Sequence, residues 1–209
     1  QIVAFHGAYH GTWHAANSLT TGDQYRAGYG PFMAGVIHLP YQYCYRCPFG
    51  LERSSCDIAC ASYVDHVLNT PYTAADDVAA VIIEPLQGEG GYIPPDPEFL
   101  QAVRAACDKH GALLIADEVQ AGAGRTGKMW SIEHAGVKPD MMTFGKGMGG
   151  DLPMAGLLMR RDLGMQLDDH SQPQTFAANA LSAEVCLTNL EIIERDGLVQ
   201  RAAEVGEEA

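Results

Sequence analysis

The sequence is short of basic residues: 13 Lys and Arg stand against 26 Asp and Glu in 209 residues, a formal charge of −13. Such an excess of negative charge repels phosphate backbones and anionic lipid surfaces. The sequence also has no apolar run near the ~20 residues that a membrane-spanning helix needs. We therefore expect neither nucleic acid nor a membrane among the partners of this protein.

Cysteine is scarce as well. The six cysteines are too few for a disulfide scaffold, and a chain of 209 residues can build a core without one. A reducing cytoplasm is therefore the expected location. No basic-then-apolar leader opens the sequence, and Gln1 enters an apolar stretch directly, so we expect the natural beginning of the protein to lie upstream.

Short apolar runs alternate with longer amphipathic ones. The apolar runs predict strands at 2–5, 36–39, 78–83, 112–116 and 141–144. The helical patterns lie at 57–68, 96–110, 181–194 and 198–208. The last three strands are near-continuous apolar runs, as in parallel strands that are covered on both faces. This alternation predicts one α/β domain with a mostly parallel sheet, helices on both faces, and sites at the carboxyl ends of the strands.

Polar residues follow four of these strands where each one ends, and the first strand runs into the segment FHGAYHG at 5–11. Glu84 and the nearby Glu89 follow the run VII, Asp117 and Glu118 follow LLIA, and Lys146 follows MMTFG. Asp, Glu and Gly are ordinary residues at turns, so each segment alone is also consistent with a plain strand end. Together at one sheet edge they favour a shared site.

Lys146 and Asp117 carry the most specific chemistry. Lys146 is one of only four lysines and follows a buried strand, where burial lowers the pKa of an amine and favours its neutral form. A neutral amine forms a Schiff base with an aldehyde. The alternative is a lysine that extends into solvent or pairs with an acid such as Glu118. A buried Asp117 carboxylate needs a cationic or hydrogen-bonding partner, and a pyridinium N–H supplies one.

Several motifs recur in an order typical of one family. They are YHG at 9–11, EPLQGEGG at 84–91, ADEVQAGAGRTG at 116–127, PD at 139–140, GKGMGG at 145–150 and TF at 175–176. With this order and spacing, the chain resembles the class III (omega-amino) transaminases, which are pyridoxal-phosphate (PLP) enzymes of fold type I, the aspartate-aminotransferase fold. A single GKG or DEV would be weak evidence, but the full series is specific.

The resemblance implies a role for each matching residue. Lys146 forms the internal aldimine and then moves the proton between the substrate carbon and C4′ of the cofactor, while Asp117 keeps the pyridine nitrogen protonated. The other implied cofactor contacts are Tyr9 on one ring face, Val119 on the other, Gln120 at the phenolic oxygen, and His10 and Glu84 beside the site.

Two further implied roles concern substrates and assembly. Glu89 resembles the family's gate glutamate, which pairs with an arginine when a second type of substrate binds. Thr175 would bind the phosphate of the neighbouring subunit's cofactor, which implies a homodimer with shared active sites. The implied substrates are an amine or amino acid and a 2-oxo acid.

The sequence also departs from the family pattern. Residues 1–209 correspond to a partial PLP-binding large domain, because the phosphate-binding segment is expected upstream and the C-terminal small domain downstream. Ala121, Ala123 and Asp151 replace residues of other types that are more usual there. These changes leave the choice of substrate open.

Four cysteines form a separate motif, C-x2-C-x8-C-x3-C, at positions 44, 47, 56 and 60. The number of thiols suits a structural metal site. The alternative is a set of half-buried thiols in an extended loop, and nothing in the motif indicates a catalytic metal. A non-catalytic metal-binding scaffold that uses Cys44, Cys47, Cys56 and Cys60 therefore remains a rival from another functional class.

The favoured function is a PLP-dependent aminotransferase that moves an amino group from an omega-amine or amino acid to a 2-oxo acid. A rival keeps the cofactor and the fold but acts as an amino-acid racemase or epimerase, or as a lyase. Return of the proton to the original substrate carbon, instead of to C4′, gives racemisation. The sequence does not rank these outcomes.

Overall fold

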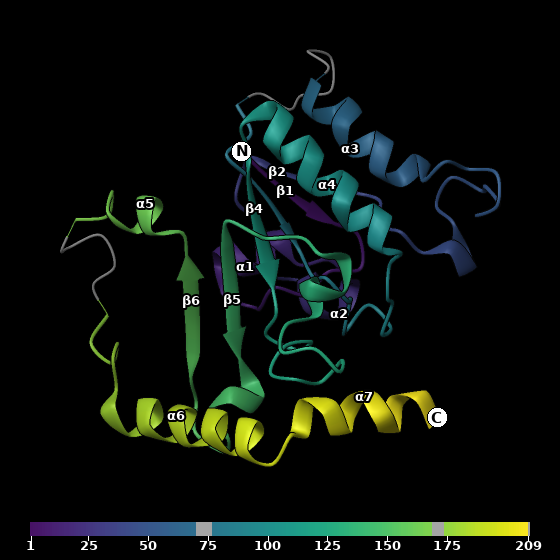
Figure 1. Ribbon diagram of the computed structural model, residues 1–209. Coiled ribbons are helices and arrows are strands. Elements are labelled where there is room, and N and C mark those ends of the chain that lie inside the picture. The colour runs from purple at the N-terminus through teal and green to yellow at the C-terminus, as the bar shows by residue number, and fades with distance from the viewer. Residues whose placement is uncertain (70–76, 169–173, 209) are drawn as a thin grey trace.

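The computed structural model describes residues 1–69, 77–168 and 174–208. Its centre is a six-stranded sheet in the order β2-β1-β3-β4-β5-β6, drawn as arrows in Figure 1. The strands are β1 (Ile2–Phe5), β2 (Val36–Leu39), β3 (Ala80–Ile83), β4 (Leu113–Asp117), β5 (Met141–Gly145) and β6 (Ala155–Met159). Strands β1 to β5 pair in parallel and β6 pairs antiparallel to β5, so the predicted α/β fold with a mostly parallel sheet is confirmed.

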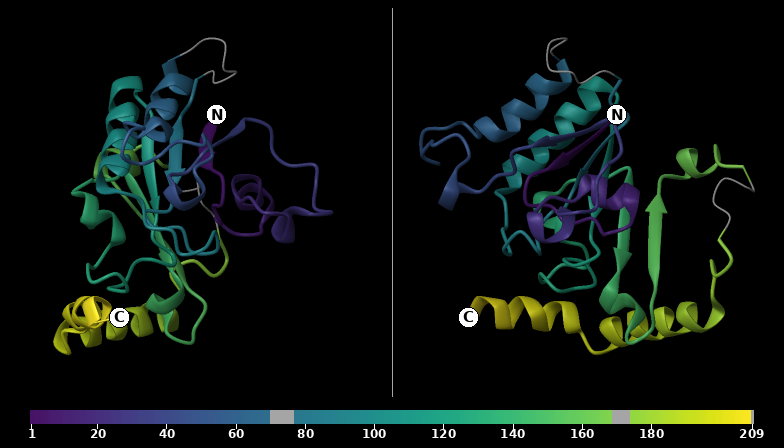
Figure 2. Two further views of the ribbon diagram at one scale, coloured as in Figure 1. Left: turned by 90° about the vertical axis from the view of Figure 1, so that its right-hand side faces the viewer. Right: turned by 180° about the vertical axis from the view of Figure 1, so that it is seen from behind.

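Helices cover both faces of the sheet, as predicted. Helices α3 (Ala59–Asn69) and α4 (Pro97–His110) lie on one face, whereas the short α1 (His14–Leu19) and α2 (Asp23–Arg26) lie on the other (Figure 2). Alternate strand residues point towards α3 and α4. The rings of Phe5, Tyr41 and Phe99 pack edge to face there, with centroids 5.3–5.9 Å apart. This cluster is the core of the molecule.

Helix α4 follows its sequence signals closely. Pro97 occupies the first turn, where a missing N–H costs nothing, and Gly111 ends the helix at φ 74°. Helix α3 begins at Ala59 and not at the predicted residue 57. Asp57 and Ile58 have φ values of 43° and 51°, in the left-handed region, which a right-handed helix excludes.

Two helices run across the edge where the parallel strands end: α6 (Ala180–Arg195) and α7 (Leu198–Glu208) (Figure 1). Asn189 of α6 donates a hydrogen bond to the carbonyl of Met148, 3.1 Å away, in the 3-10 turn η3 (Lys146–Gly149). Helix α7 packs on the loop after β4, where a Cβ at Gly127 would lie 2.9 Å from Cα of Ala203. The two helices therefore brace the segments on either side of the predicted site.

The last strand of the sheet was not predicted. Gly156 of β6 faces the ring of Phe144, and a Cβ there would lie 2.1 Å from that ring, so the strand needs a glycine that weakens its apolar pattern. The remaining short elements are α5 (Arg161–Gly164), η1 (Cys44–Arg46) and η2 (Ser131–Ala135). No helix in the described ranges is long and apolar enough to cross a membrane.

Candidate active site

The strand ends bring the predicted polar residues to one edge of the sheet. Glu84 follows β3, Asp117 ends β4 and Lys146 follows β5, and these three strands are neighbours. A cavity of about 270 Å³ opens there between the segments that follow β4 and β5. Apart from glycine and alanine, the residues that line it are Tyr92, Glu118, Val119, Gln120, Arg125 and Lys146.

Asp117 is buried and accepts three hydrogen bonds. Its Oδ1 accepts hydrogen bonds from the Thr143 hydroxyl at 3.0 Å and from the Val119 N–H at 3.1 Å, and its Oδ2 lies 2.7 Å from Nδ1 of His10. Burial alone would raise the pKa of Asp117, but His10 and the two other donors hold the pKa below its ordinary value. Asp117 is therefore a fixed anion at the sheet edge.

His10, in the loop that follows β1, orients this carboxylate. An ionised carboxylate only accepts hydrogen bonds, so Nδ1 of His10 must carry the proton. The other ring nitrogen, Nε2, is buried and has no hydrogen-bond partner among the described residues. His10 therefore supports Asp117 directly, an arrangement more specific than the predicted place beside the cofactor.

Lys146 reaches the same region from β5. Its Nζ donates to Oε1 of Gln120 at 2.5 Å, and its backbone takes a left-handed φ of 46°. The predicted burial of Lys146 is wrong, because the residue is exposed. The strand ends at Gly145, and Lys146 begins the turn η3 at the open mouth of the cavity.

The alternative partner of Lys146 is occupied elsewhere. Glu118 accepts hydrogen bonds from the backbone N–H groups of Ile132 at 2.7 Å and Ser131 at 3.0 Å. Burial raises the pKa of Glu118 to about 7, although these two N–H groups favour its charged form. Glu118 thus anchors the start of η2, and Gln120 is the partner of Lys146.

Glu84 organises the loops around the site. Its Oε1 accepts from the Tyr9 N–H at 2.7 Å and its Oε2 from the Gly88 N–H at 2.9 Å. Burial raises the pKa of this carboxyl. A Cβ at Gly88 would lie 2.5 Å from Nε2 of Gln120, so the glycine lets Gln120 fit between the loop and Lys146. Glu84 is therefore a positioning residue for the loops that carry Tyr9 and Gln120.

Glu89 is exposed on the glycine-rich loop. Its Oε2 accepts a hydrogen bond from the hydroxyl of Tyr25 at 2.6 Å, a contact that raises the pKa of Tyr25. The ring of Tyr25 also packs on that of Tyr9, with centroids 4.6 Å apart. The structure thus joins the predicted gate residue to the predicted stacking residue through Tyr25.

Thr175 does not join the cavity within this chain. It lies in an exposed turn just before α6 and is not among the residues that line the cavity. Residues 169–173, which precede it, lie outside the described residues.

Two contributors were missed at the sequence level, Thr143 and Tyr25. Thr143 carries the one hydroxyl group in an otherwise apolar strand, and its position opposite Asp117 accounts for this polar residue. A hydroxyl within an apolar run was the signal from which the sequence could have identified it. Tyr25 had none, because only the fold brings α2 beside the loop of Glu89.

The four clustered cysteines lie away from this cavity. They are free thiols that line a pocket of their own. In the described part of the chain, no group of three or more His, Cys, Asp or Glu side chains is placed to hold a metal ion as it stands. Burial raises the pKa of Cys60 to about 11 and that of Cys107 to about 12, so neither thiol is suited to nucleophilic catalysis.

The sequence profile of the class-III aminotransferases matches residues 1–209. The chain belongs to that family. It is 41% identical over 206 residues to a 4-aminobutyrate aminotransferase of Escherichia coli, covering 98% of this chain and 46% of that protein. A leucine/methionine racemase of Thermococcus litoralis is 37% identical over 205 residues, with coverage of 98% and 46%.

Solved structures give the same result for the fold. An amine transaminase from an uncultivated Pseudomonas species, solved in its PLP-bound internal-aldimine form, superposes with a TM-score of 0.92 at 28% identity. The match covers 100% of this class-III chain and 48% of that structure. The resemblance inferred from the motifs is confirmed, and the chain spans about half the length of the curated relatives it matches.

Proposed function

We propose that residues 1–209 form the PLP-binding large domain of an aminotransferase that moves an amino group from an omega-amine or amino acid to a 2-oxo acid. The observation that carries the proposal is the pairing of a buried, triply hydrogen-bonded Asp117 with Lys146 on adjacent strands of one sheet edge. A fixed anion and an amine on neighbouring strands suit a cationic ring that carries an aldehyde. The cavity of about 270 Å³ borders Lys146, whereas Asp117 is not among its lining residues.

The residues present fit the cofactor. Val119 and Gln120 line the cavity next to Lys146, and Tyr9 is held at its loop by Glu84. When bound, PLP supplies an aldehyde that exchanges with amines and a ring that withdraws electrons from the substrate carbon. In this proposal Val119 and Tyr9 would contact the ring, and Gln120 would bind its phenolic oxygen.

Asp117 holds a proton at the ring nitrogen. Because His10, Thr143 and the Val119 N–H keep the carboxylate ionised and fixed, its charge is already in place when negative charge develops in the ring. With the cofactor bound, the Lys146 amine would hold its aldehyde and would serve as the group that takes up and returns the proton of the substrate carbon. Gln120 positions the Lys146 amine by accepting its hydrogen bond at 2.5 Å.

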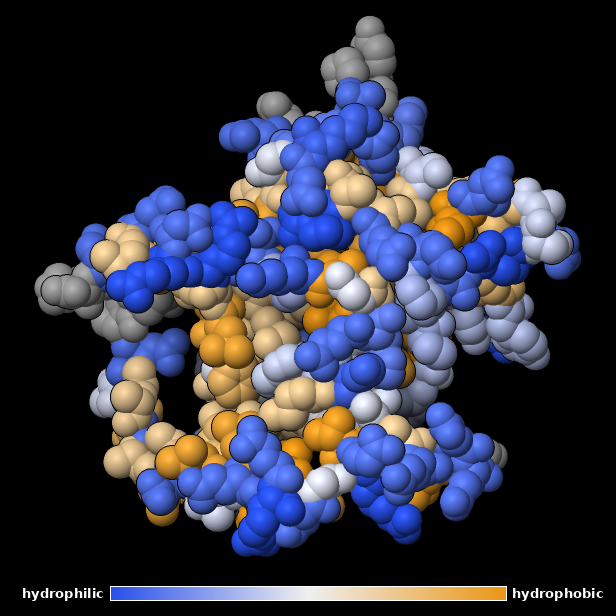
Figure 3. Space-filling view, viewed as in Figure 1, coloured by the Kyte–Doolittle hydropathy of each residue, from blue (hydrophilic) through white to orange (hydrophobic). Residues whose placement is uncertain are grey.

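A homodimer with shared sites completes the proposal. Lys146 is exposed in the single chain, and Thr175 lies outside its own cavity, which suits a site covered by a second subunit whose Thr175 binds the phosphate. Apolar side chains gather over β5, β6 and α6 (Figure 3), including Leu157, Leu158 and Leu187. Exposed apolar patches of this kind favour protein–protein contact.

Two finer features are also proposals. We place the protein in the cytoplasm, where its six free thiols stay reduced.

Glu89 is proposed to act as the substrate gate by exchanging Tyr25 for an arginine when the second substrate binds.

A labelled amine tests the function. The holoenzyme is incubated with a 15N-labelled omega-amine or amino acid and a panel of 2-oxo acids. Transfer of 15N into a new amino acid, together with an aldehyde or keto acid from the donor, is expected. Release of 15N as ammonia without transfer would instead identify a lyase and contradict the proposal.

The racemase relative defines the second candidate function. Racemisation needs the proton to return to the original substrate carbon on the opposite face, instead of moving to C4′. The same incubation in deuterated water separates the two functions. A D/L mixture with deuterium at the substrate carbon and no nitrogen transfer would favour the racemase.

A further inference from the structure

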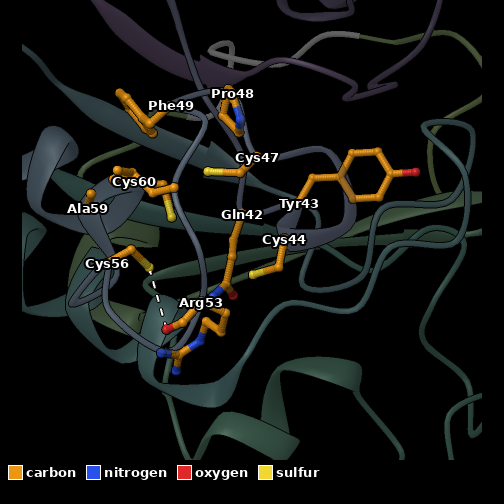
Figure 4. A pocket seen from close by; sticks show the side chains of 11 residues that line it. Gln42, Tyr43, Cys44, Cys47, Pro48, Phe49, Arg53, Cys56, Ala59 and Cys60 are labelled. Carbon is orange, nitrogen blue, oxygen red and sulfur yellow. Dashed lines mark hydrogen bonds between the residues drawn. The ribbon is translucent and has the colours of Figure 1, made fainter.

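The four clustered cysteines enclose a small pocket that the proposed reaction does not use. Cys44 and Cys47 come from the turn η1 and its exit, Cys56 lies in the loop before α3, and Cys60 lies in the first turn of α3. All four line one cavity of about 20 Å³. Figure 4 shows the two pairs on opposite sides, with their sulfur atoms directed towards the space between them.

The chemistry of the lining is selective. Besides the four thiols, the pocket is bounded by apolar or aromatic side chains and by Gln42 and Arg53, and no carboxylate is among these lining residues. Hard cations such as Mg²⁺ and Ca²⁺ need oxygen ligands, whereas thiolates select soft or borderline ions such as Zn²⁺. A volume of about 20 Å³ has room for one water-sized occupant.

An ion pair lies at the pocket wall. A zinc ion bound by four thiolates carries a net charge of −2, and the Arg53 guanidinium at the wall is paired with Asp96. Asp96 also accepts from Nε2 of Gln42 at 2.8 Å and precedes α4. An ion here would therefore join the η1 loop to the starts of both α3 and α4.

The backbone between the second pair of cysteines is strained. Asp57 and Ile58 are consecutive left-handed residues, and for a β-branched residue such as Ile58 this conformation is a true outlier. Strain of this kind persists only where the surroundings impose it. Here it turns the chain so that Cys56 and Cys60 face the same pocket.

We propose that Cys44, Cys47, Cys56 and Cys60 form a structural site for one zinc ion. On binding, four S–H bonds break, four protons pass to solvent and four Zn–S bonds form. Because the thiols do not stand at coordination spacing as they are, binding must draw them closer together. Such closure is usual, since metal sites are rarely preformed without the ion.

Metal analysis of the holoenzyme tests this site. Protein purified under reducing conditions should contain about one zinc ion per chain. The double variant Cys47→Ser/Cys60→Ser, with one change from each pair, should lose zinc by more than about tenfold. Cys186→Ser, on α6 and outside the pocket, is the matched control and should keep it. Zinc that is undiminished in the double variant would overturn the proposal.

Two measurements on the unchanged protein cover the case in which the double variant does not fold. Cobalt exchanged for zinc should give thiolate-to-metal charge-transfer bands, and a mercurial reagent should release the ion as it titrates the four thiols. Reduced protein that takes up no zinc would overturn the proposal. So would disulfides among these four cysteines in cells lysed into an alkylating reagent, because they would identify a redox pair.

Discussion

Asp117 and Lys146 end adjacent strands, yet their surroundings differ sharply. Asp117 is buried and receives hydrogen bonds from three groups of its own chain, whereas Lys146 is exposed and donates to one side chain, Gln120. The electrostatic half of the site is therefore complete within this chain. The half that carries the reactive amine is open, and we propose that a second subunit covers it.

This contrast separates two parts of the proposed chemistry. Asp117 supplies a fixed charge, while Lys146 supplies the amine that would hold the cofactor. Loss of the amine should abolish covalent attachment, whereas loss of the Asp117 charge should slow turnover and leave attachment in place. The following predictions, from the largest expected effect to the smallest, test that difference.

Lys146→Ala should abolish turnover and covalent attachment of PLP. Because Lys146 is exposed, the free energy of unfolding should change by no more than about 0.5 kcal/mol. Absorbance of the holoenzyme and chemical denaturation measure the two effects. Lys138→Ala, at another lysine on the surface of the chain, is the control. A borohydride-reducible chromophore in the Lys146 variant would show that another lysine is the anchor.

Asp117→Asn should lower kcat/KM by about 10²- to 10³-fold, or ~3–4 kcal/mol of transition-state stabilisation. The amide keeps an oxygen for Thr143 and Val119 but removes the charge at the ring nitrogen. Stability should change little, since size and most hydrogen bonds persist. Steady-state kinetics and thermal unfolding check both statements, and wild-type rates would place another group at the ring nitrogen.

Glu118 predicts a pH dependence of stability. Burial raises its pKa to about 7 in the folded chain, against an ordinary value of 4.5, so the folded state holds this proton more tightly than the unfolded chain. Its contribution is present below about pH 4.5 and is lost as the pH rises through about 7, on the order of 3 kcal/mol.

Urea unfolding of wild type and Glu118→Gln between pH 4.5 and 8 measures this contribution. The difference between the two curves should vary across that window, whereas the exposed Glu207→Gln should leave the wild-type slope unchanged. Identical slopes for wild type and Glu118→Gln would contradict the assigned pKa.

Thr175→Ala should weaken cofactor retention by roughly tenfold, the loss of about one hydrogen bond to a charged group. The chemistry of the cofactor that stays bound should not change. Equilibrium dialysis of the dimer measures retention, with Ser55→Ala, an exposed hydroxyl before α3, as the control. A fully active monomer in sedimentation would exclude the shared site.

Much of the fold was predictable because its signals are local. The apolar runs located β1 to β5, and Pro97 with Gly111 located α4. Strand β6 escaped because Gly156 interrupts its pattern for a reason that only the facing Phe144 ring explains. The start of α3 was misplaced because two left-handed residues, Asp57 and Ile58, cannot be read from an amphipathic pattern.

The candidate site divides in the same way. The motifs identified Asp117, Gln120 and Lys146, because each follows a strand whose end is visible in the sequence. The contacts of His10 and Thr143 with Asp117 depend on register and loop approach across 107 and 26 residues. Exposure of Lys146 was mispredicted because a strand pattern does not show where the sheet edge opens.

The most direct test of the central claim is to locate the lysine that holds the cofactor. Borohydride makes the bond between PLP and its lysine permanent, and peptide mapping then identifies the modified residue among the four lysines of the chain. The account predicts modification at Lys146 in wild type and in Asp117→Asn. Modification at Lys109, Lys128 or Lys138, with Lys146 unmodified, would contradict it.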